Sequence, residues 1–165
     1  MQLSGGTQIG AQWILMTTFA ASFYGIGNIW MTQFGWRLWP YVAPDDFGAY
    51  HSAWWAMIKP VVFPVAAISV LGSIALIWWR PEGVTAAPVW LNITLHVATY
   101  TLTAAFWARW QAQTHYARLP NGSLDPTHVR AMSTHWIRAT LITLNGVAVF
   151  WMVIQHLSSK TGKLT

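Results

Sequence analysis

The sequence predicts an all-α protein, namely an integral membrane four-helix transmembrane bundle. The chain has 165 residues, of which 55% are hydrophobic and only 8% are charged. A soluble domain usually carries roughly 25% charged residues, so this chain has too few charges to cover a surface exposed to water. Its 13 tryptophans gather near both ends of four long apolar segments, as expected where indole rings meet lipid headgroups.

Each of these segments is long enough to cross the hydrocarbon core of a bilayer, which takes about 20 apolar residues in a helix. Helices are expected because a single segment must satisfy its own backbone hydrogen bonds in lipid. The four segments form one domain over residues 1–165. The predicted spans cover residues 9–32, 60–79, 88–107 and 136–156.

The second span illustrates how the ends are defined. Lys59 and Arg80 bracket a run of uncharged residues one membrane thickness long, and a lysine at a span edge can extend its amine to the headgroups. Pro60 suits the first turn of a helix, and Pro64 is expected to kink it. The short connection RPEGVTAAP makes the second and third spans antiparallel neighbours.

The charged residues bear on orientation and on partners. Nine Lys and Arg stand against four Asp and Glu, a formal net charge of +5. This scattered excess does not suit nucleic acid and fits loops beside anionic lipid headgroups. Most of the basic residues lie on the side of the two long loops, so the positive-inside rule predicts that these loops are cytoplasmic, in a bacterial-type cytoplasmic membrane. Because cysteine is absent, disulfides and cysteine-ligated metals are excluded.

Polar residues form a stripe on one face of the third span and another on one face of the fourth. Lipid offers these groups no hydrogen bonds, so the stripes are expected to face one another inside the bundle. They serve either as packing contacts between helices or as a functional site, since amides and ionisable groups are costly in a membrane. The stripes consist of Asn92, His96, Thr99 and Thr103, and of Arg138, Asn145, Met152 and His156.

A metal site is one candidate on the side of the long loops. His51 precedes the second span, His115 follows the third and His135 opens the fourth. The ends of these helices can bring the three imidazoles together, with Asp45 or Asp46 supplying a carboxylate. Such a ligand set suits Fe, Cu or Zn. No HxxxH or HxxEH spacing is present, so the prediction depends on the convergence of separate helices.

A b-type haem is a second candidate cofactor. A haem held between two helices needs facing histidines, and His96 with His156 is such a pair, while His115 with His135 is another. His96 and His115 are 19 residues apart, about 28 Å along a helix. Two haems would therefore lie at opposite membrane edges, too far apart for fast electron transfer between them. A single haem is left as the alternative.

Three short elements on the long-loop side resemble the anthrone-oxygenase-like small membrane proteins, a family of four-helix proteins. The elements are FGAYHSAWW before the second span, QTHYARL at the end of the third and STHWIRAT at the start of the fourth. The matching positions are His51, His115, His135, Trp136 and Arg138. This chain departs from the family pattern after Arg138, because HWIRAT has an alanine where a threonine follows directly.

The resemblance implies a membrane-embedded oxidoreductase, specifically an oxygenase-like protein, acting on a hydrophobic and often aromatic small molecule that arrives through the lipid bilayer. His135 or His115 would act as the base, and Arg138 would stabilise the resulting oxyanion. Dioxygen would then react with the anion, with or without a metal.

Two other classes of function stay open at this stage. The bundle can be a non-catalytic subunit of a larger membrane complex, with histidines that are structural or bind haem or pigment. It can also be a small transporter or channel lined by the polar stripes, which would need to form a homo-oligomer because four helices enclose only a narrow path.

Overall fold

A computed structural model of the protein describes residues 5–161, and these residues are almost entirely helical. No strand occurs among them, and the one isolated β-bridge joins Arg118 to Leu124 in a loop. The elements are α1 (Gly5–Gly35), a short 3-10 helix (Trp36–Tyr41), α2 (Pro44–Ala75), α3 (Ala86–Leu102), a π-helical segment (Thr103–Trp107), α4 (Ala108–Gln113) and α5 (Pro126–Thr161).

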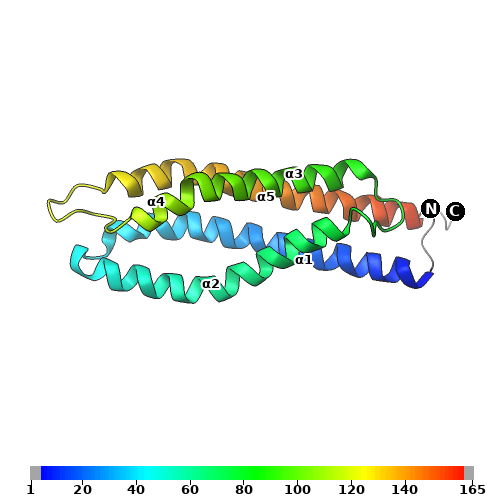
Figure 1. Ribbon diagram of the computed structural model, residues 1–165, viewed down its shortest axis with the longest axis horizontal. Helices are drawn as coiled ribbons and strands as arrows, with labels where there is room; N and C mark the ends of the chain where they lie inside the picture. Colours follow the sequence, from blue (N-terminus) through cyan, green and yellow to red (C-terminus); the bar gives the residue numbers. More distant parts are fainter. Residues whose placement is uncertain (1–4, 162–165) are drawn as a thin grey trace.

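The helices lie side by side in an elongated bundle, with α3, the π-helical segment and α4 forming one continuous rod (Figure 1). Helix α5 packs against both α1 and α3, and α2 packs mainly against α1. Successive long helices run in opposite directions, so the start of α1 and the end of α5 lie at the same end of the bundle (Figure 1).

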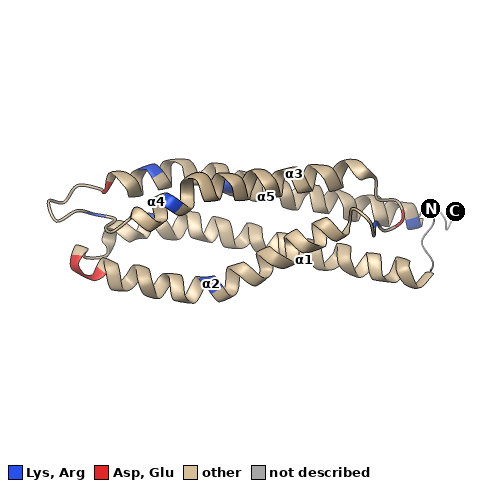
Figure 2. Ribbon diagram, in the orientation of Figure 1, with Lys and Arg blue, Asp and Glu red and all other residues tan. Residues whose placement is uncertain are grey.

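Three helical segments are long and apolar enough to cross a membrane, namely Gly5–Tyr41, Pro44–Ala75 and Pro126–Thr161. Large apolar side chains such as Trp13, Leu71 and Leu157 are exposed on the outside of the bundle. Asp and Glu occur only at its two ends (Figure 2). This distribution confirms the prediction of an all-α protein with membrane-length helices.

Helix α2 starts well before the predicted span. It begins at Pro44, and Asp45 and Asp46 lie in its first turn, where proline and negative charge both favour a helix N-terminus. The helix then continues through Pro60 and Pro64, and Figure 1 shows that it changes direction along its length. The sequence located the apolar part of this helix but not its polar first turns.

Close helix packing depends on small residues and on polar contacts between helices. Ser22 and Ser69 join α1 to α2 through a hydrogen bond of 2.9 Å between their hydroxyls. Asn92 and Asn145 join α3 to α5, because each side-chain amide donates to the backbone carbonyl of the other, at 3.2 and 3.3 Å. The polar stripes of these two helices therefore face each other, as predicted.

Candidate functional site

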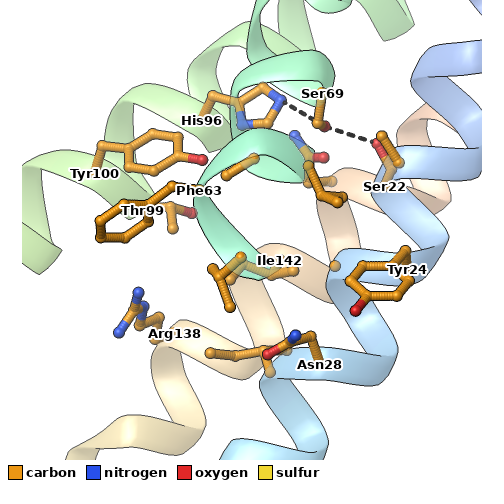
Figure 3. Close-up of a pocket in the computed structure, with 17 residues that line it drawn as sticks. Ser22, Tyr24, Asn28, Phe63, Ser69, His96, Thr99, Tyr100, Arg138 and Ile142 are labelled. Carbon is orange, nitrogen blue, oxygen red and sulfur yellow. Dashed lines mark hydrogen bonds between the residues drawn. The ribbon is translucent and has the colours of Figure 1, made fainter. Parts of the chain in front are cut away.

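A cavity of about 120 Å³ lies inside the bundle, between α1, α2, α3 and α5 (Figure 3). This volume is well above the roughly 10–15 Å³ that one water molecule needs. Most of its wall is apolar, and a few polar side chains project into it from four helices. They are Ser22, Tyr24 and Asn28 of α1, Ser69 of α2, and His96, Thr99, Tyr100, Arg138 and Asn145 of α3 and α5. We call this cavity the central pocket.

Arg138 is the only charged side chain that lines the central pocket. Its ionisable neighbours are Tyr100, across the gap to α3, and His135, one helical turn earlier on α5. No carboxylate balances it, because the acidic residues lie at the ends of the bundle (Figure 2). Its Nε is buried and has no hydrogen-bond partner. A guanidinium without an anionic partner in an apolar setting is costly, and such groups usually serve a function.

His96 faces the same pocket and is held by serines of α2. Its Nε2 lies 3.2 Å from Ser73 Oγ and 3.4 Å from Ser69 Oγ. The Ser73 hydroxyl already donates to the carbonyl of Ser69, at 2.6 Å, so its oxygen accepts a hydrogen from His96 Nε2. In the neutral imidazole the other nitrogen, Nδ1, then carries the lone pair. With the hydrogen on Nε2 for the Ser73 contact, Nδ1 is the nitrogen of His96 that can accept a proton.

His135 lies next to the pocket but does not line it. The residue is fully buried, and Nδ1 is 2.6 Å from Gln33 Oε1, which only accepts, so Nδ1 carries the hydrogen. Its ring packs on Trp36 with centroids 4.4 Å apart. Within residues 5–161, four buried polar atoms have no partner, and three belong to Trp36, His135 and Arg138. Because buried polar atoms are normally paired, the three unpaired atoms of Trp36, His135 and Arg138 are unusual.

Replacing Gln33 by leucine is expected to lower the free energy of unfolding by about 1 to 2 kcal/mol, because it leaves His135 Nδ1 buried without an acceptor. The matched control is Gln113→Leu at an exposed position, which should have little effect. Unfolding in detergent micelles measures both. Equal stability of the two variants would show that the Gln33–His135 contact contributes nothing.

His51 and His115 come together at the end of the bundle that holds the long loops. His51 is close enough to His115 for the two rings to interact electrostatically, and its Nε2 accepts a hydrogen bond of 3.1 Å from Trp55 Nε1. It also stacks on Phe47, with centroids 5.6 Å apart. His51 thus belongs to an aromatic cluster, defined here by Trp36, Trp39, Phe47, His51, Trp54 and His128.

The five residues predicted as metal ligands are not assembled into one site. No group of three His, Asp or Glu residues within positions 5–161 is placed to hold a metal ion. Asp45 and Asp46 are exposed in the first turn of α2, while His135 is buried behind Trp36 and turned toward Gln33. The helix ends do converge, but tryptophan side chains fill the space between the imidazoles.

The two histidine pairs predicted to hold haem do not face each other either. Because Asn92 and Asn145 are side by side on antiparallel helices, His96 and His156 lie in opposite directions from that point, roughly 22 Å apart along the bundle. His156 Nδ1 instead donates to the carbonyl of Glu82, at 2.8 Å. In the other pair, His115 is exposed and lies beside His51, whereas His135 is buried.

The sequence predicted Arg138, Asn145 and His96 as interior polar residues on separate helices, but it did not predict that they meet in one pocket, which Asn28 of α1 also lines. It placed the catalytic site with His115 and His135 instead. The π-helical segment, which follows Tyr100 closely, also had no sequence signal. A π-helical turn often occurs at a functional site, and here it lies beside the helix that supplies Tyr100 and His96.

Comparisons of the chain with family models, with curated proteins and with solved structures give no match. The resemblance to anthrone-oxygenase-like proteins therefore stays a prediction from the three sequence elements.

Proposed function

We propose that this protein is a membrane-embedded, oxygenase-like enzyme acting on a hydrophobic, weakly acidic aromatic molecule bound in the central pocket. The observation that carries the proposal is Arg138, a cation that lines an apolar cavity and has no carboxylate partner. Such a residue is suited to an anion that forms only when the substrate loses a proton.

The proposal includes a fourth membrane span. Helix α3 has only 17 residues, about 26 Å in length, but the π-helical segment and α4 extend the same rod to Gln113. Together they are long enough to cross the hydrocarbon core beside the three longer helices. The central pocket would then lie within the bilayer, where a hydrophobic molecule can reach it from the lipid. The long loops, which carry most of the basic residues, would face the cytoplasm.

In the proposed reaction, a CH₂ group that is conjugated with a ketone through an aromatic ring is oxidised by dioxygen. His96 Nδ1 takes a proton from the carbon, and Arg138 stabilises the enolate oxygen. Dioxygen adds to the carbanion carbon to form a peroxide anion, which takes the proton back from His96. Loss of water leaves a carbonyl, so that R₂CH₂ and O₂ give R₂C=O and H₂O.

This assignment changes the base that the sequence suggested. His115 is exposed in the connection after α4, away from Arg138. His135 is one turn from Arg138, but its ring is fully buried and the pocket wall does not include it. His96 is the imidazole that shares the pocket with Arg138, and Figure 3 shows the two side chains projecting from different helices toward the same cavity.

The test is oxygen consumption by protein in lipid vesicles with anthrone as the probe substrate. Arg138→Gln is expected to lower turnover by about a hundredfold, in the range found when one donor to an oxyanion is removed. The matched control is Arg130→Gln on the same helix, whose guanidinium is exposed and lies over the ring of Trp110. This control should keep full turnover.

Equal turnover of the Arg138 and Arg130 variants would overturn the role of Arg138. Binding of anthrone without oxygen uptake by the unaltered protein would overturn the enzymatic function, and it would favour a protein that only binds or carries such molecules.

A further inference from the structure

A second cavity of about 460 Å³ lies between α1 and α2. Its wall contains no charged residue and is built largely from apolar side chains and two glycines. We call it the α1–α2 groove, and it is lined by Tyr24, Gly27, Asn28, Met31, Thr32, Gly35, Trp54 and Ile58.

The groove adjoins the central pocket at two residues. Tyr24 and Asn28 line both cavities. In Figure 3 these two side chains stand together on α1, on the opposite side of the pocket from His96. Tyr24 and Asn28 therefore form the boundary between the two cavities, and a molecule that reaches from Arg138 into the groove has to pass them.

The groove is open at the positions of its two glycines. A Cβ atom added at Gly27 or at Gly35 would meet no other atom within 4 Å. By contrast, a Cβ atom at Gly72, where α1 and α2 are in close contact, would meet Thr18. The two helices thus pack tightly at one end and are separated at the other, where Met31, Trp54 and Ile58 offer an apolar surface.

We propose that the molecule bound by this protein has two parts, an acidic aromatic ring in the central pocket and an alkyl substituent in the α1–α2 groove. Arg138 selects the phenolic or enolic oxygen of the ring, and the uncharged wall of the groove selects the hydrocarbon. The ligand class is that of alkyl-substituted phenols and related enolisable aromatics. This inference depends on the proposed function for the placement of the ring.

The test compares binding of para-cresol and para-octylphenol to the full-length protein in phosphatidylcholine vesicles, corrected for uptake by vesicles without protein. Gly27→Leu adds a side chain in the open space of the groove, while Gly10→Leu makes the same change at an exposed position elsewhere on α1 that is equally open. The pair therefore matches in helix propensity and in added apolar surface.

The unaltered protein and Gly10→Leu are expected to bind octylphenol at least about tenfold more tightly than cresol, the lower limit for a single added methylene in a hydrophobic pocket. Gly27→Leu should lose this preference and retain its affinity for cresol. Gly35→Leu, a second substitution in the groove, should behave in the same way.

The outcomes separate the two proposals. If Gly27→Leu and Gly35→Leu both keep the preference for octylphenol, the alkyl chain does not occupy the groove, and the ring site still stands. If Arg138→Gln leaves cresol binding unchanged, or if the unaltered protein binds no cresol, the ring site is wrong and both proposals fall.

Discussion

Replacing Trp39 by alanine is expected to lower the free energy of unfolding by about 3 to 5 kcal/mol, the usual effect of removing a large aromatic side chain from a packed interior. Trp39 is only 2% exposed. Its ring contacts those of Trp36, His51 and Trp54, with centroid distances of 5.2, 5.2 and 5.3 Å. No single neighbour can fill the space that the indole leaves.

The control is Trp13→Ala, at a position on α1 where the side chain is 70% exposed on the outside of the bundle. Its removal takes away no packing inside the protein, so the stability in detergent micelles should stay close to that of the unaltered chain. Thermal unfolding followed by near-ultraviolet circular dichroism measures both variants. A small loss with Trp39→Ala would show that the aromatic cluster does not hold this end of the bundle together.

The second large loss of stability is expected from a substitution at the contact between α1 and α2. Gly72→Val should destabilise the protein by about 3 kcal/mol, the upper part of the range for overpacked interiors. An added Cβ at this position would meet Thr18, which is fully buried and whose hydroxyl is held by the carbonyl of Ile14 at 2.7 Å. Thr18 cannot turn away without losing this bond, so the two helices must separate.

Gly10→Val is the matched control, because a side chain at Gly10 meets nothing within 4 Å. Both substitutions place a β-branched residue in a helix interior, so the difference between them isolates the contact with Thr18. Unfolding by increasing sodium dodecyl sulfate in mixed micelles gives the comparison. Similar midpoints for the two variants would contradict the close packing of α1 against α2.

The elements of the fold were predictable because membrane-length helices leave a local signal. The predicted spans 9–32 and 136–156 lie within α1 and α5, and residues 60–75 of the span 60–79 lie within α2, which ends at Ala75. The polar first turns of α2 and α5 were not predicted, since they extend beyond the apolar segments and resemble loops in composition. It was also predictable that the polar stripes containing Asn92 and Asn145 face each other, because helical periodicity places the polar residues on one side of each helix.

The site was only partly predictable. Arg138 stood out because a guanidinium is costly in lipid, and it does line the central pocket. The partners proposed for it were chosen from positions near helix ends, where His51, His115 and His135 all occur. The positions of the aromatic side chains were not predicted. Trp36, Trp39 and Trp54 occupy the space where the imidazoles were expected to meet.

The sequence by itself determined that the chain is helical and apolar enough for a membrane, because hydropathy and the helical repeat are properties of consecutive residues. Only the tertiary structure decided which polar residues meet. His96 joins Arg138 at one pocket while His135 turns to Gln33, and this choice depends on the tilt of the helices and on the volume of each side chain between them. A single sequence specifies neither the tilt of each helix nor how the side chains between the helices fill the space.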